Sequence, residues 1–184
     1  NMPKVREFVK KLGAEMCKKF EVQWAGGDEE RLEQIQELRL KEQEEAEKRV
    51  ILEYINEYPD TVLLRENEKG HLTSSGFIMN KDLTKVLMIH HNIYNTWAWT
   101  GGHADGDEDL LYVALKEARE ETGVKHIEPL MSEIASIDIL PVWGHMKKGK
   151  YVATHMHLSV AYILIADEDQ ALHINEDENS GVKW

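Results

Sequence analysis

One short segment, residues 110–122, constrains the fold more than any other part of the chain. Its apolar residues recur at the three- and four-residue spacing of an amphipathic helix. Asp107 or Asp109 is placed to cap the start of this helix, and Gly123 is a typical left-handed stop at its end. The other face carries three glutamates at positions i, i+3 and i+4, namely Glu117, Glu120 and Glu121. The sequence therefore predicts a helix with one face in a core and one strongly anionic face.

Packing does not explain why the three glutamates stand so close together. Like charges at this spacing repel each other and destabilise an isolated helix. Hard divalent cations such as Mg²⁺ bind carboxylate oxygens and would reverse the repulsion. A solvated Glu-rich face is the usual alternative, and the residues that precede the helix favour the metal.

A glycine-rich loop, predicted over residues 101–108, leads into the helix. Gly101 and Gly102 open it directly after a predicted strand. Glycine permits a positive φ angle and lets a metal ion or a phosphate approach the main chain. Glu108 lies eight positions before Lys116, so an ion pair between the loop and the helix is expected.

From Gly102 to Val124 the chain resembles the signature of the Nudix hydrolases, G-x5-E-x7-R-E-U-x-E-E-x-G-U, in which U is a bulky apolar residue. Six of the seven fixed positions match, at Gly102, Glu108, Glu117, Glu120, Glu121 and Gly123, and Lys116 stands where the family has arginine. Chance agreement of this extent has a probability on the order of 10⁻⁵ over the chain, from the average frequencies of glycine and glutamate. Lysine keeps the charge but lacks the planar fork of arginine, so we expect it to orient Glu108 or Glu117 less rigidly.

This resemblance implies divalent-metal-dependent hydrolysis of the diphosphate bond in a nucleoside diphosphate linked to another moiety, by water attack on phosphorus. It implies Mg²⁺ or Mn²⁺ as the cofactor, held by Glu117, Glu120, Glu121 and the carbonyl of Gly101. Glu120 is the first choice as general base, and Glu176 or Glu178 are more distant candidates. The residues that support the box (residues 102–124) would be Gly102, Glu108, Lys116 and Gly123.

Two other functions use the same fold. A sensor that binds a nucleoside diphosphate without hydrolysing it could dispense with the three carboxylates, which are all present here. Isomerisation of an isopentenyl diphosphate is disfavoured because the lone cysteine, Cys17, lies far along the chain from the box. A metal-dependent pyrophosphatase is therefore the leading hypothesis, and the sensor is the alternative.

Several side chains outside the box are candidates for substrate contact. His155 and His157 alternate on one predicted strand, and His103 adjoins the glycine pair. These three imidazoles could bind phosphate or a second metal, or they could be ordinary hydrogen-bonded histidines. Trp99 could stack on a base or ribose, although packing in the core is the commoner role for such a side chain. Glu178 completes this set.

The chain divides into two predicted parts, a helical extension at residues 1–57 and a Nudix domain at 58–184. The extension contains predicted helices at 4–24 and 29–57, and the second suits either a coiled-coil seam or docking on its own domain. In the domain, β-rich runs are predicted at 76–80, 86–91, 97–99, 134–142 and 151–166. Strands on both sides of a helix predict a mixed α/β fold, which the resemblance specifies as an α/β/α sandwich whose last helix would begin near Trp184.

The net charge of −12 limits the partners. A protein this acidic is a poor ligand for nucleic acid or for an anionic membrane. A single cysteine excludes an intramolecular disulfide and a Cys-based zinc knuckle. We expect a cytoplasmic, nucleotide-hydrolysing enzyme whose partner is a small-molecule nucleoside diphosphate derivative, and a homodimer remains an open option.

Overall fold

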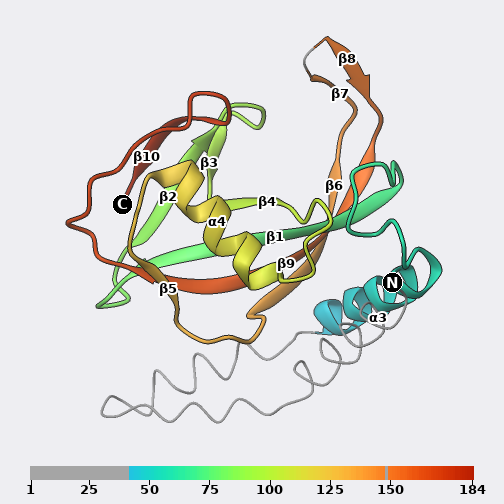
Figure 1. Ribbon diagram of the computed structural model, residues 1–184, viewed down its shortest axis with the longest axis horizontal. Coiled ribbons are helices and arrows are strands. Elements are labelled where there is room, and N and C mark those ends of the chain that lie inside the picture. The colour runs from blue at the N-terminus through green and yellow to red at the C-terminus, as the bar shows by residue number, and fades with distance from the viewer. Residues whose placement is uncertain (1–41, 148) are drawn as a thin grey trace.

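The computed structural model describes residues 42–147 and 149–184, and Figure 1 shows a β-sheet with helices packed against it. The elements in chain order are α3 (Glu42–Glu57), β1 (Gly70–Asn80), β2 (Val86–His91), β3 (Thr96–Ala98), β4 (Thr100–His103), α4 (Leu110–Thr122), β5 (Ile127–Pro129), β6 (Ser136–Val142), β7 (His145–Lys147), β8 (Lys150–Val152), β9 (His155–Ala166) and β10 (Asn179–Lys183). The predicted helix at 4–24, the first part of the helix at 29–57 and Cys17 lie outside the described residues.

Strands β1 and β9 form the centre of the sheet. They run parallel along their whole length, from Gly70 opposite Met156 to Asn80 opposite Ala166. The main strand order is β10-β2-β1-β9-β5, with β3 paired to β2, β4 to β1 and β6 to β9. These other pairings are antiparallel, so the sheet is mixed and the predicted mixed α/β fold is confirmed.

The core lies against one face of this sheet. Leu72 and Ile78 of β1 are fully buried, as are Leu158 and Leu164 of β9, because alternate side chains of a strand point to the same face. Helix α4 contributes Leu110, Ala114 and Ala118 to the same cluster. The sequence pattern of α4 therefore docks it on the centre of the sheet, beside β1 and β4 (Figure 1).

Helix α3 packs along strand β6. Ile51 and Ile55 belong to the core cluster, Ser136 Oγ donates to Glu44 Oε1 at 3.0 Å, and the Ile139 amide donates to Glu47 Oε2 at 3.1 Å. Of the two alternatives for this helix, its described part therefore fits docking on its own domain.

Several predicted boundaries need correction. The run predicted at 76–80 is the second half of β1, and the strand predicted at 151–166 is divided into β8 and β9. The predicted loop is partly a strand, since β4 extends through His103 by pairing with β1. These errors share a cause: a strand's ends depend on its partners, and those partners lie far away in the sequence.

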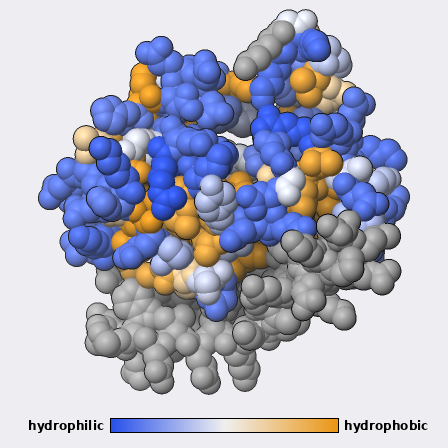
Figure 2. Space-filling view, in the orientation of Figure 1, coloured by the Kyte–Doolittle hydropathy of each residue, from blue (hydrophilic) through white to orange (hydrophobic). Residues whose placement is uncertain are grey.

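Hydrophilic residues cover much of the face shown in Figure 2, and hydrophobic ones reach the surface in patches between them. Neither of the helices in residues 42–147 and 149–184 has the length and apolar character that crossing a membrane requires.

Candidate functional site

Helix α4 has the ends that the sequence predicts. Asp109 is its N-cap, and its Oδ1 accepts a hydrogen bond from the Tyr112 amide at 2.9 Å. Gly123 ends the helix with a φ of 76°, and its amide donates to the Arg119 carbonyl at 2.9 Å. A side chain at Gly123 would be strained by this φ and would also meet His173 at 2.9 Å. Local geometry therefore sets where the helix that carries the three glutamates begins and ends.

Strand β4 and helix α4 approach each other closely at Gly102. A Cβ on this residue would lie 2.3 Å from Cδ of Glu117, so only glycine leaves room for that carboxylate. Ser74 on the neighbouring strand β1 ties the helix to the sheet, since its Oγ donates to the Leu110 carbonyl at 2.5 Å. The glycine of the box thus makes the space in which Glu117 lies.

The three glutamates have unequal surroundings. Glu121 is 2% exposed, and its Oε2 accepts a hydrogen bond from the Gly101 amide at 2.9 Å. Burial raises the pKa of Glu121 to about 8, although the Gly101 hydrogen bond opposes the rise. Glu117 is 8% exposed, and burial raises its pKa as well. Glu120 is exposed, so one of the three carboxylates faces solvent.

Lys116 is the cation nearest to these acids in the described structure. Its Nζ lies 3.0 Å from Glu117 Oε1 and 3.4 Å from Glu120 Oε2. The expected pair with Glu108 is not formed: Glu108 is half-buried and makes no ion pair with the other described residues. Lys116 therefore orients two of the candidate ligands, Glu117 and Glu120. The sequence predicted the contact with Glu117 but not the one with Glu120.

Glu178, a more distant candidate, lies close enough to affect the box. After burial and the Gly101 hydrogen bond, the charge of Glu178 is the next influence on the pKa of Glu121, and it raises that pKa. Its neighbour Asn179 donates from Nδ2 to the Glu121 carbonyl at 2.8 Å. The first residue of β10, directly after the turn that holds Glu178, is thus fastened to the end of α4. Glu176 in the same turn is exposed.

Trp99 lies between β3 and β4, two residues before Gly101. Its side chain is 44% exposed and contacts Phe77 edge-on, with ring centroids 5.7 Å apart. Trp97 is 38% exposed, and Lys183 Nζ lies 4.0 Å from its ring centroid. Core packing was therefore the wrong expectation for Trp99, because β3 and β4 on either side of it lie off the main strand order of the sheet.

The candidate histidines come together, with one addition. His103, His155 and His157 gather around His71, whose ring centroid lies 5.0 to 5.2 Å from each of theirs. Burial is the main cause that lowers the pKa values of His103 and His157 to about 3. Sequence reasoning missed His71, since only the pairing of β1 with β9 brings it opposite His157.

An ion pair that the sequence did not suggest lies beside His103. Arg65 Nε donates to Asp105 Oδ1 at 2.6 Å, and Arg65 Nη2 donates to Asp105 Oδ2 at 2.5 Å. Their charges act on His103 in opposite senses: Arg65 lowers its pKa after burial has done so, and Asp105 raises it. The pair fastens the loop before β1 to the loop that follows β4.

The chain is similar to known proteins over most of the described region. A family profile described as the NUDIX domain matches residues 69–184. Similar solved structures are an Ap4A hydrolase from C. elegans (17% identity, 61% of this chain and 77% of that chain, TM-score 0.40), a NUDIX-family hydrolase from Clostridium perfringens (21%, 62% and 79%, 0.43) and the dihydroneopterin triphosphate pyrophosphohydrolase of E. coli (15%, 61% and 78%, 0.46). No curated protein sequence matches the chain.

Proposed function

Because this chain belongs to the NUDIX family and is a hydrolase of that type, we propose that it hydrolyses the diphosphate bond of a nucleoside diphosphate linked to another moiety. The reaction is attack of water on phosphorus, and it depends on a divalent metal ion. The observation that carries this proposal is the acidic face of α4, on which Glu117 and Glu121 are buried and Glu120 is open to solvent.

The donor set on this face fits Mg²⁺ or Mn²⁺. The carboxylates of Glu117 and Glu121 are buried, and Lys116 pairs with the first of them; a divalent cation would offset the cost of ionising both there. Glu117, Glu120, Glu121 and the Gly101 carbonyl would hold the ion, with oxygen as the only ligand type. When bound, the metal would neutralise charge on the diphosphate and make water a better nucleophile.

Glu120 is the best candidate for the general base. Such a group must reach the attacking water and take its proton, and an exposed carboxylate can do so. Lys116 pairs with both Glu117 and Glu120, and Glu121 accepts a hydrogen bond from the Gly101 amide. What distinguishes Glu120 is that Glu117 and Glu121 are buried and its own side chain is exposed. Glu178 is the second candidate, because it is exposed and directly precedes Asn179, which is fastened to the end of α4.

Trp99 is the best candidate for contact with the nucleoside. Its ring is partly exposed and held in place by Phe77, so a base or ribose could stack on it. His103, His155 and His157 are less suited to a phosphate, because they are largely buried among other imidazoles. A buried neutral imidazole offers less attraction to an anion than a cationic side chain does.

A substrate panel tests the proposal. The purified chain is incubated with nucleotide sugars, dinucleotides and nucleoside triphosphates, with Mg²⁺ and separately with Mn²⁺, and product phosphates are measured. We expect metal-dependent turnover of at least one nucleoside diphosphate derivative. Inactivity on the whole panel with both metals would contradict the proposal. Tight binding of a nucleotide without metal or turnover would favour the sensor.

A further inference from the structure

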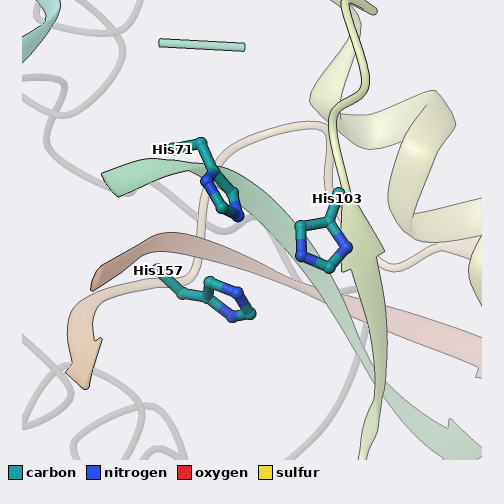
Figure 3. Close-up of side chains that lie close together, drawn as sticks. All are labelled: His71, His103 and His157. Atoms are coloured by element: carbon teal, nitrogen blue, oxygen red, sulfur yellow. The ribbon is translucent and has the colours of Figure 1, made fainter. Parts of the chain in front are cut away.

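Three imidazoles converge on the side of strand β4 that faces away from helix α4. Gly102 is paired with Ser74 and adjoins Glu117, whereas His103 is paired with Thr73. Successive residues of a strand point to opposite faces, so His103 and Glu117 lie on different sides of β4. His71 and His157 are directly opposite each other in the parallel pair of β1 and β9. Figure 3 shows the three rings pointing toward a common centre.

The spacing of these rings suits a shared ligand. One ring nitrogen from each of His71, His103 and His157 lies within 4.8 Å of the other two. In a tetrahedral zinc site with Zn–N bonds of about 2.0–2.1 Å, the ligand nitrogens are about 3.3 Å apart. Small side-chain rotations toward the centre would therefore bring the three nitrogens to coordination distance.

His71 contributes the most direct sign of a missing partner. It is 4% exposed, and its Nδ1 lies 3.2 Å from the Asn67 carbonyl. A carbonyl oxygen only accepts, so Nδ1 carries the hydrogen and Nε2 carries the lone pair. This Nε2 is buried without a hydrogen-bond partner among the described residues. A histidine whose second ring nitrogen donates to a backbone carbonyl is also the usual arrangement of a metal ligand.

The charges around the cluster favour a cation over an anion. The imidazoles of His71, His103 and His157 are buried or half-buried, and burial disfavours the charged form of a histidine. Neutral imidazoles offer lone pairs to a metal and little attraction to a phosphate. Arg65 and Lys147 are the cations that act on His157, and the Arg65 guanidinium is already paired in two hydrogen bonds with Asp105.

We propose that His71, His103 and His157 bind one divalent transition-metal ion, of which Zn²⁺ is the best match, at a site separate from the box carboxylates. Imidazole nitrogen suits Zn²⁺ and its neighbours in the first transition row, whereas Mg²⁺ prefers oxygen ligands. Three protein ligands leave a fourth position open, as in catalytic zinc sites. His155 adjoins the cluster, since its Nε2 lies 3.3 Å from Nε2 of His157.

Metal binding by the full chain, purified without a histidine tag and freed of metal with a chelator, tests this proposal. Zn²⁺ is titrated calorimetrically in excess Mg²⁺, which occupies the carboxylate site. We expect one Zn²⁺ per chain, and a loss of affinity of at least about 100-fold in each of His71→Asn, His103→Asn and His157→Asn, because removing a ligand should cost no less than removing its outer-shell partner. His126→Asn is the matched control, since this exposed histidine lies outside the cluster, and it should bind as the wild type does.

Further measurements separate the two metal sites and guard against misfolding. Glu117→Gln and Glu120→Gln should keep Zn²⁺ binding, because their side chains lie across β4 from the cluster or in solvent. Co²⁺ added to the wild-type protein should give the strong visible absorption of a low-symmetry, nitrogen-ligated ion. This measurement does not depend on whether any variant folds. The proposal is overturned if the wild type binds no Zn²⁺, or if only the glutamate variants lose it. Neither outcome bears on hydrolysis, because binding is measured without substrate.

Discussion

Strand β4 separates two groups of buried side chains with opposite chemistry. Glu117 and Glu121, on the side of helix α4, are oxygen donors with raised pKa values. His103 and His157, on the other side, are nitrogen donors with lowered pKa values. Burial is the first cause in all four residues, and it acts in opposite directions because it disfavours the negative form of an acid and the positive form of a base.

This contrast implies that the two proposed sites, on either side of one strand, would suit two different cations. The carboxylates suit a hard ion such as Mg²⁺, and the imidazoles suit a borderline ion such as Zn²⁺. The acidic group comes from one helix, so its members have fixed spacing. The imidazoles come from β1, β4 and β9, so their spacing depends on strand pairing. Variants on each side should therefore change one site and spare the other.

The largest expected effect is on turnover. Glu120→Gln should lower kcat by about 10²–10⁴-fold, the usual contribution of a general base, and leave the fold intact because the side chain is exposed. Steady-state kinetics and circular dichroism measure the two effects. Glu128→Gln, at an exposed glutamate of β5, is the control. Turnover like that of the wild type would remove Glu120 from the mechanism.

The pH dependence of stability should distinguish the carboxylates on the α4 side of β4 from the imidazoles on the other side. The pKa of Glu121 is about 8 in the folded chain against a reference value of 4.5. Because the folded value is the higher one, the stabilising contribution is complete below pH 4.5 and is lost as pH rises through 8. In metal-free protein, the free energy of unfolding should fall over this range by on the order of a few kcal/mol relative to Glu121→Gln.

Denaturant unfolding of the two proteins at a series of pH values measures that difference. Added Mg²⁺ should reduce it, because a bound cation stabilises the ionised carboxylate. Equal pH profiles for the wild type and Glu121→Gln would show that the buried carboxyl does not control stability.

Gly102→Ala tests how closely β4 and α4 must approach. The new Cβ would lie 2.3 Å from Cδ of Glu117, so that carboxylate must move, at a cost of about 1–3 kcal/mol. Thermal unfolding measures the loss. The double variant Gly102→Ala/Glu117→Ala should lose less stability than the sum of the losses in the two single variants, because alanine at 117 leaves room for the new Cβ. Additive losses would place the strain elsewhere.

The smallest expected effect concerns Lys116. Its Nζ lies 3.0 Å from Glu117 and 3.4 Å from Glu120, and arginine would offer the same acids a planar fork. Because the lysine is partly exposed, Lys116→Arg should change the free energy of unfolding by less than about 1 kcal/mol. Chemical denaturation checks this, with Lys116→Met as the variant that removes the charge. A larger loss in Lys116→Arg would show that the site requires the compact ammonium.

The sequence by itself determined the helix and its acidic face. The boundaries of α4, its Asp109 cap and its Gly123 stop all follow from short-range rules, and the structure agrees with them. The strands were predicted less well, because β1 and β4 extend only where a partner continues the ladder. Both outcomes have one physical reason: helical hydrogen bonds join near neighbours, and strand hydrogen bonds do not.

Only the tertiary structure decided how each side chain is used. Spacing alone treats Glu117, Glu120 and Glu121 as equals, whereas packing buries two and exposes one. Sequence spacing also gave no sign that His71 belongs to the cluster, although His71 is paired directly with His157 in the ladder between β1 and β9. Burial and strand register both depend on contacts between segments that are distant in the sequence. A local motif therefore specifies which side chains are available, and the assembled sheet decides which of them meet.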